Sequence, residues 1–229
     1  MIERGPEEIR AANMQRMGEA LGSQFSALWQ ELAQVHVEWQ EYVVLFGTKP
    51  ERIDILNKTA PSFFHMIQER LWDVTLLNIA RLTDPPKSAG KSNLTITNFP
   101  TLISDQALAA KIQGLIEAAQ ERARFCRDWR NRRIAHNDLA LALNEAAEPL
   151  SESSRLLVNE ALAALTNVMG EIEAHYDGGY RTDYLDIVIT NGAEDLLYVL
   201  HDGVAAKSER IKRIVEGRYR PDDLNRVDL

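Results

Sequence analysis

The chain has 229 residues, of which 45% are hydrophobic and 26% are charged, and this composition excludes a disordered or collagen-like chain. The length corresponds to one domain, or to one domain with an appendage. A single cysteine, Cys126, excludes an intramolecular disulfide and a zinc finger. The acidic start does not resemble a secretory signal peptide, and no run of about 18 apolar residues predicts a membrane span. We therefore expect a cytoplasmic protein.

Apolar residues recur at intervals of three and four through most of the sequence, which predicts an almost entirely helical protein. The first apolar stripe, over residues 17–46, predicts one long helix with a break near Leu21. A short helix is expected over about residues 48–57. A third helix, over 59–83, is apolar around much of its circumference, so we expect it to be buried on several sides.

The second half of the sequence continues this pattern after one long interruption. Residues 85–98 are rich in proline, glycine, serine and lysine, so we expect a loop that is mobile or functional rather than packed. A strand-like run at 185–189 is too short and isolated to found a sheet. The remaining helices are expected over about residues 104–129, 151–178 and 191–217.

These elements predict an all-α, up-and-down helical bundle that forms a single domain. Its core is expected to span about residues 7–176, and a C-terminal helical extension is expected over about residues 177–229.

The net charge of −8 disfavours general binding of nucleic acid, but basic residues are concentrated in two segments. Between residues 122 and 133, six arginines are opposed by a single aspartate. A second basic stretch lies at 207–220. Each cluster is either the solvated face of a helix or a local site for an anion, and charge alone favours the solvated face.

The segment Arg130-Asn131-Arg132-Arg133-Ile134-Ala135-His136 places a histidine at the end of the densest arginine cluster. Arginine can hold a phosphate and stabilise charge on its oxygens, while histidine transfers protons near neutral pH. This pair is what metal-independent cleavage of RNA requires. The structural alternative is a helix end that is rich in ion pairs and closed by a histidine.

No metal site is expected. The pairs His65/Glu69 and Glu171/His175 have helical i,i+4 spacing, whereas carboxylate-bridged metal bundles use Glu-x-x-His together with further inward glutamates.

The segment from Arg130 to His136 resembles the signature of the HEPN superfamily, in which an arginine, usually followed by a polar residue, precedes a histidine by a short spacer. Two further stretches are similar to the abortive-infection AbiU-like branch. They read Thr59-Ala-Pro-Ser-Phe63 and Ile79-Ala-Arg-Leu-Thr-Asp-Pro-Pro86. The resemblance covers most of residues 20–205.

The resemblance implies an all-α HEPN fold and a homodimer in which arginine and histidine of both subunits form a composite site. It implies a metal-independent endoribonuclease, without a cofactor, of a phage-defence or toxin–antitoxin type. The partners that it implies are RNA or a nucleotide and a cognate antitoxin protein. It implies no association with a membrane. The alternative within the superfamily is a catalytically silent module that binds a nucleotide or a protein. A third alternative is a structural helical adaptor with Arg130 and His136 buried in ion pairs.

In the ribonuclease interpretation, His136 is the general acid and base, and Arg130 binds the scissile phosphate. On a regular helix these two residues lie about 120° apart, so they converge only if the helix ends or bends, or across a dimer. Arg133 is the alternative phosphate ligand. Asn131 and Arg127 are further candidates for substrate binding.

Two polar residues of the helix expected over 59–83, Asn78 and Arg81, are candidates to line the same cleft. The alternative is that Arg81 forms an ion pair with Asp84 at the helix end.

Overall fold

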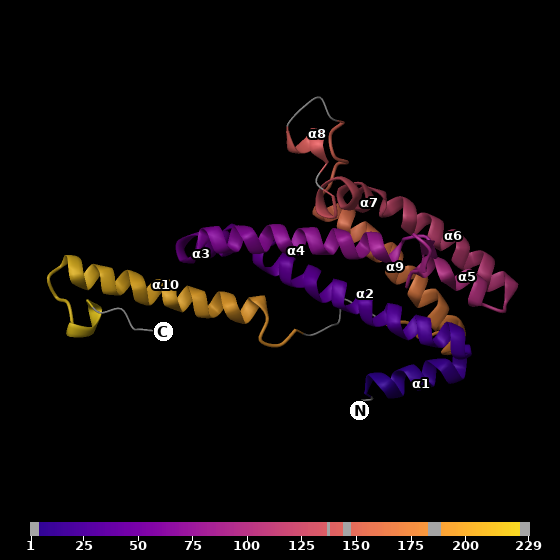
Figure 1. Ribbon diagram of the computed structural model, residues 1–229. Helices are drawn as coiled ribbons and strands as arrows, with labels where there is room; N and C mark the ends of the chain where they lie inside the picture. Colours follow the sequence, from indigo (N-terminus) through magenta and orange to yellow (C-terminus); the bar gives the residue numbers. More distant parts are fainter. Residues whose placement is uncertain (1–4, 137, 144–147, 183–188, 225–229) are drawn as a thin grey trace. The chain divides into compact units, whose positions relative to one another are not determined.

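The computed structural model describes residues 5–136, 138–143, 148–182 and 189–224 (Figure 1). Residues 185–188 of the predicted strand-like run lie outside the described residues. Helices make up nearly all of the regular structure described, which confirms the predicted all-α class. None of the described helices is both long enough and apolar enough to cross a membrane.

The α-helices of the described residues are α1 (Pro6–Met17), α2 (Glu19–Phe46), α3 (Pro50–Thr59), α4 (Pro61–Leu82), α5 (Phe99–Leu102), α6 (Gln106–Arg122), α7 (Arg124–Trp129), α8 (Leu139–Ala142), α9 (Arg155–Tyr176) and α10 (Ala193–Val215). The shorter elements are strands β1 (Lys87–Ser88) and β2 (Lys91–Ser92), the 3-10 helices η1 (Ile96–Asn98) and η4 (Pro221–Asp223), and a π-helical turn, η2 (Arg130–Ile134).

The residues group by their contacts into two units. The first comprises Met1–Trp39 and Trp72–Ile187, and the second comprises Gln40–Leu71 and Val188–Leu229. Helices α2 and α4 contribute residues to both units. The part of the expected C-terminal extension that follows residue 187 therefore groups with residues 40–71.

In the first unit, α6 packs against α9, and the core lies among these helices, α2 and α4. Fully or almost fully buried side chains of this core include Phe25, Leu28, Leu76, Ile79, Ile112, Ile116, Val168 and Ile172. Each such burial contributes about 1.5–3 kcal/mol relative to an exposed side chain. The apolar stripes of the sequence are therefore what hold this unit together.

In the second unit, the N-terminal part of α10 packs on α3. Its core is the cluster of Leu45, Leu56, Phe64, Ala193 and Leu197. The carboxylate of Glu41 accepts a hydrogen bond of 2.6 Å from the backbone N–H of Ala193. A negative charge at this position is favourable because unsatisfied N–H groups and the helix dipole meet at the first turn of α10.

The long N-terminal helix is interrupted, as predicted, although the break falls at Gly18 and not at Leu21. Gly18 has a φ of 84°, a left-handed conformation that glycine adopts without steric cost. Helix α1 then packs against α2 so closely that a Cβ at Gly22 would lie 2.5 Å from backbone atoms of Asn13. The two helices are also joined by a buried hydrogen bond of 3.0 Å from Asn13 Nδ2 to Ser26 Oγ.

The segment at 85–98 is more ordered than predicted. Strands β1 and β2 form an antiparallel hairpin whose tip, Ala89-Gly90, has φ values of 48° and 77°. The prediction of an unpacked loop is wrong for the second half of the segment, because Thr95 and Ile96 are buried. Thr95 Oγ1 lies 2.8 Å from the carbonyl oxygens of both Leu82 and Asp84. This hydroxyl anchors the loop to the end of α4.

We expect Gly22→Ala to destabilise the protein by about 1–3 kcal/mol, because its methyl group would overlap the backbone of α1. Urea denaturation measures the free energy of unfolding. Gly114→Ala is the matched control, since a Cβ there would meet nothing within 4 Å, and alanine is the better helix former. Equal stability of Gly22→Ala and the wild type would show that α1 does not pack as described.

The two halves of the 85–98 segment should respond differently to mutation. Deleting Ser88–Lys91 should leave the thermal transition nearly unchanged, because these residues are exposed and Lys87 and Ser92 are already neighbours across the hairpin. Thr95→Val should cost about 1–3 kcal/mol, because it removes a buried hydroxyl that donates to the end of α4, and the carbonyl oxygen of Leu82 loses this donor. A large loss of stability on the deletion alone would contradict this division.

Candidate functional site

The helix that carries the arginine cluster changes its winding where the Arg–His segment begins. After α7 the chain forms the π-helical turn η2, in which the N–H of Ala135 donates to the carbonyl oxygen of Arg130 at 2.8 Å. This i→i+5 bond widens the turn, and the helix ends there. Arg130 and His136 consequently line the same cavity, which a regular helix would not favour.

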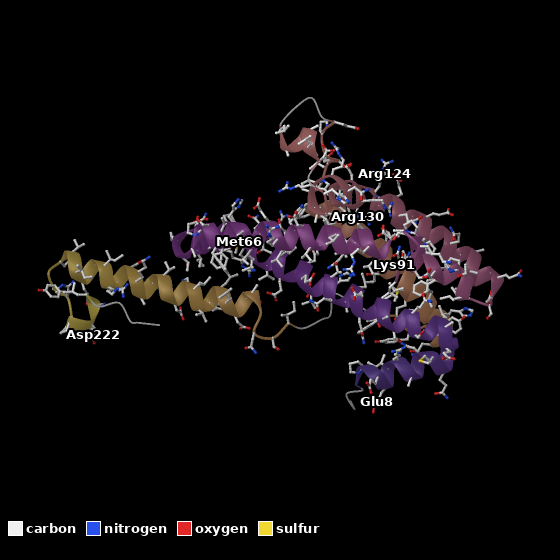
Figure 2. The ribbon with its side chains drawn as sticks, in the orientation of Figure 1. Glu8, Met66, Lys91, Arg124, Arg130 and Asp222 are labelled. Carbon is white, nitrogen blue, oxygen red and sulfur yellow. The ribbon has the colours of Figure 1, made fainter. Side chains whose placement is uncertain are left out.

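The cavity has a volume of about 870 Å³ and belongs entirely to the first unit. Its polar lining includes three arginines, three carboxylates, two amides and one histidine. They are Arg124, Arg127, Arg130, Asp84, Glu117, Glu121, Gln120, Asn131 and His136. Arg124 begins α7 and Arg130 begins η2 (Figure 2), so the chain from α6 to η2 supplies one wall.

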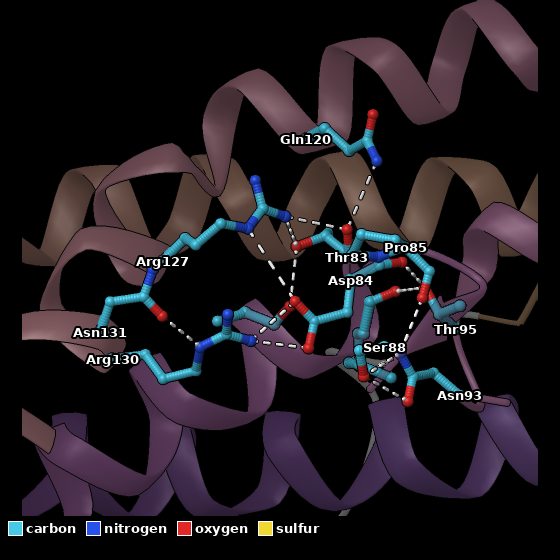
Figure 3. A network of polar contacts seen from close by, with 12 residues as sticks. Thr83, Asp84, Pro85, Ser88, Asn93, Thr95, Gln120, Arg127, Arg130 and Asn131 are labelled. Carbon is cyan, nitrogen blue, oxygen red and sulfur yellow. Dashed lines mark hydrogen bonds and ion pairs between the residues drawn. The ribbon is translucent and has the colours of Figure 1, made fainter. Parts of the chain in front are cut away.

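Arg130 is held on one edge by a carboxylate from α4's end (Figure 3). Its Nη1 lies 2.7 Å from Oδ1 and 2.6 Å from Oδ2 of Asp84, and its Nε donates to Asn131 Oδ1 at 3.0 Å. The side chains of Arg130 and Asp84 are only 20% and 18% exposed. Within the described residues, Nη2 of Arg130 has no hydrogen-bond partner, so that part of the guanidinium can receive an anion.

Arg127 lies on the other side of the same carboxylate. Its Nη2 donates to the carbonyl oxygen of Thr83 at 2.9 Å, and its Nε lies 3.9 Å from Asp84 Oδ1. Gln120 makes a longer contact of 3.4 Å to the same carbonyl group. The C-terminal end of α4 is therefore fixed by donors from α6 and α7.

His136 is exposed, and among the residues that the structure describes it has no hydrogen-bond partner. Its imidazole is therefore available for proton transfer with a molecule in the cavity.

The neighbouring arginines are engaged elsewhere. The guanidinium of Arg133 lies 5.1 Å from the centre of the Trp129 ring, and Arg133 is not among the cavity-lining residues. Arg132 donates to the carbonyl oxygens of Glu148 and Pro149. The structure thus places Arg130, and not Arg133, where a ligand of the cavity would lie.

Asp128 binds the chain at Ser151 and also lies close to Arg132. Its carboxylate accepts a hydrogen bond of 2.8 Å from the backbone N–H of Ser151. Burial raises the pKa of Asp128, but the bonds from Ser151 and the charge of Arg132 outweigh it and hold the pKa below the ordinary value. This carboxylate has a structural role rather than a place in the cavity.

Asn78 and Arg81 are not among the residues that line the cavity. Arg81 Nη1 donates to Asn78 Oδ1 at 3.1 Å, and Asn78 Nδ2 donates to Glu38 Oε2 at 3.4 Å. Asp84, the other end of the ion pair considered for Arg81, is instead bound to Arg130.

Sequence reasoning missed Asp84, Glu117, Gln120, Glu121 and Arg124 as residues of this site, and Asp84 is the one that binds Arg130. The available signal was its presence in the stretch Ile79–Pro86, which had already been singled out as similar to the AbiU-like branch.

The charge of the cavity also differs from that of the sequence window. The three arginines of the lining are matched by Asp84, Glu117 and Glu121, because α4 and α6 bring carboxylates to a cluster that looks strongly basic along the chain. The cavity therefore carries no excess positive charge that would attract polyanions in general. It suits a ligand that has one negative group and further polar groups.

The described residues give little support to a metal site or to a cysteine nucleophile. No group of three or more histidine, cysteine, aspartate or glutamate side chains there is arranged to hold a metal ion. Burial raises the pKa of the Cys126 thiol to about 12, so this cysteine stays protonated and is a poor nucleophile.

Comparisons with known proteins identify the family of the chain. No curated protein and no solved structure matches the chain. The model of the family HEPN_AbiU2, described as AbiU2, matches residues 18–199, a span that includes Asp84, Arg130 and His136. Because the match covers most of the sequence, the chain belongs to the AbiU2 family of HEPN proteins, as the resemblance predicted.

Proposed function

We propose that this protein is a metal-independent endoribonuclease of a phage-defence or toxin–antitoxin type, which acts as a homodimer with a composite arginine–histidine site. The observation that carries the proposal is that Arg130 and His136 line one cavity, each with a nitrogen that has no partner among the described residues. Membership of a HEPN family supports it.

The proposed reaction uses the internal 2′-hydroxyl of the RNA as the nucleophile. His136 accepts the proton of this hydroxyl, and the 2′-oxygen attacks the neighbouring phosphorus. Arg130 binds the non-bridging oxygens of the phosphate and stabilises the charge that grows on them. The 5′-oxygen leaves with a proton from an imidazolium, and the products are a 2′,3′-cyclic phosphate and a 5′-hydroxyl.

A dimer would supply two histidines, one as the base and one as the acid. Among the described residues, His136 is the one histidine that lines the cavity, and a second copy would add the histidine that donates a proton while the first accepts one. On α4, Phe63 is 53% exposed and Met66, labelled in Figure 2, is 47% exposed, and exposed apolar side chains of this kind are what an interface covers.

A second candidate function is a silent module that binds a nucleotide or a protein partner. The observation that favours it is the ion pair between Asp84 and Arg130, because the carboxylate already occupies one edge of the guanidinium that a substrate phosphate would use.

The decisive measurement is cleavage of total RNA by purified protein in the presence of a chelator. We expect His136→Ala to lower the rate about 100-fold or more, through loss of proton transfer. Arg130→Lys should also lose most activity, because an ammonium group lacks the planar fork that binds phosphate. Arg133→Lys is the matched control, and it should cleave like the wild type. Equal cleavage by the wild type and His136→Ala would mean that the activity resides elsewhere.

Asp84→Asn separates the two candidate functions. If Asp84 positions Arg130 for cleavage, the variant should cleave RNA about tenfold or more slowly, since small displacements of catalytic groups are costly. If Asp84 only competes with a bound anion, the variant should bind nucleotides more tightly, with no cleavage by either protein. Isothermal titration with a mononucleotide beside the cleavage assay distinguishes these outcomes, and circular dichroism checks that the variant is folded.

The oligomeric state tests the composite site directly. Light scattering at micromolar concentration should give twice the mass of one chain, and a stable interface of this kind should bury at least about 1,000 Å² in total. A strict monomer that still cleaves RNA would remove the composite site from the proposal.

A further inference from the structure

We infer that the α6 wall of the cavity selects a guanine base next to the scissile phosphate, through the carboxylates of Glu117 and Glu121. This inference rests on the proposed function, since it states which RNA the site would take. It concerns residues that lie outside the Arg–His segment and that play no part in the proposed proton transfers.

The cavity is lined by two chemically different groups, the carboxylates of α6 and the arginines of α7 and η2. The lining residues of α6 lie at helical spacing on one face of that helix, and those of α7 follow after the break at Ala123. In order they are Glu117, Gln120, Glu121, Arg124 and Arg127. A ligand that places its phosphate at Arg130 can therefore place another group against the carboxylates.

The two glutamates are free to accept hydrogen bonds from a ligand. Both are exposed, and their contacts are weak ones along the same stretch of chain. Glu117 accepts from Gln113 at 2.8 Å, and Glu121 lies 3.6 Å from Arg124. Exposed contacts of this kind contribute about 0–1 kcal/mol, so a ligand can replace them at little cost.

The chemistry of a carboxylate determines which part of an RNA it can touch. An ionised carboxylate only accepts hydrogen bonds, and it repels the phosphate groups of the backbone. A base edge with N–H donors is the complementary group. The cavity volume of about 870 Å³ is large enough for such a base beside a phosphate.

Guanine fits this wall better than the other bases. Its Watson–Crick edge carries two adjacent N–H donors, which can bind both oxygens of one carboxylate in a bidentate pair. The amide N–H group of Gln120, which now makes only a 3.4 Å contact, can donate to the neighbouring carbonyl oxygen of guanine. Adenine and cytosine place one amine beside an acceptor nitrogen, and uracil places one N–H between two carbonyl groups.

The test uses fluorescent 2′-O-methyl trinucleotides of guanine, adenine, cytosine or uracil, which cannot be cleaved because the 2′-hydroxyl is blocked. Binding is measured by anisotropy at low salt with the full-length protein. We expect the guanine trinucleotide to bind at least about tenfold more tightly than the uracil trinucleotide. Glu117→Gln and Glu121→Gln, combined, should remove most of that ratio. Glu31→Gln, an exposed change of the same charge on α2, should leave the ratio intact.

The outcomes separate this inference from the proposed function. Arg130→Lys should weaken all four trinucleotides alike, because it affects the phosphate. If the wild type binds all four equally, or if the double variant keeps the guanine preference, the base-selecting wall is refuted while RNA binding at Arg130 stands. If the wild type binds no trinucleotide at all, both the wall and the proposed function are refuted.

Discussion

The ion pair between Asp84 and Arg130 is the contact on which the whole candidate site depends. It joins residues 46 positions apart in the sequence, and it connects the end of α4 to the first residue of η2. Both side chains are about four-fifths buried, so the pair is screened by water less than a surface pair. Loss of Asp84 would leave the Arg130 guanidinium without its counter-ion and without its orientation.

The backbone around Asp84 is itself fixed from several directions. The hydroxyls of Thr95 and Thr97 bond to its carbonyl oxygen at 2.8 Å, and Arg127 bonds to the carbonyl oxygen of Thr83. These bonds satisfy acceptors that the end of α4 would otherwise leave unpaired. The loop after α4, the helix α7 and the cavity are therefore parts of one hydrogen-bonded arrangement, in which the orientation of Arg130 is set by residues far from it in the chain.

Much of the fold follows from the sequence, because helical periodicity and helix-ending residues act locally. The order of the longer helices and a break in the first one agree with the prediction, whereas the helix expected over 104–129 is divided at Ala123 into α6 and α7, and the short helices α5 and α8 were not predicted. The hairpin at residues 87–92 and the buried Thr95 were not predicted, because the polar composition of the loop conceals a hydroxyl that bonds to a distant helix end. The pairing of Asp84 with Arg130 was missed because these residues lie 46 positions apart in the sequence.

The sequence was also an incomplete guide to the site's geometry and charge. Regular helical geometry separates Arg130 from His136, and only the π-helical turn brings both to one cavity. A count of charges along residues 122–133 suggests a strongly basic surface. In the folded chain Glu117 and Glu121, just outside that window, line the same cavity, and Asp84 is brought to the arginines from the end of α4 by packing, which a linear window does not contain.

The balance of charge has a consequence for any ligand of this cavity. A polyanion gains little from a site in which carboxylates equal arginines, because long-range attraction largely cancels. Binding must then come from short contacts, in which a phosphate meets a guanidinium and an N–H donor meets a carboxylate. Such contacts depend on orientation, whereas net attraction does not. In a chain of net charge −8, the proposed RNA substrate would be held by such short contacts and not by net attraction.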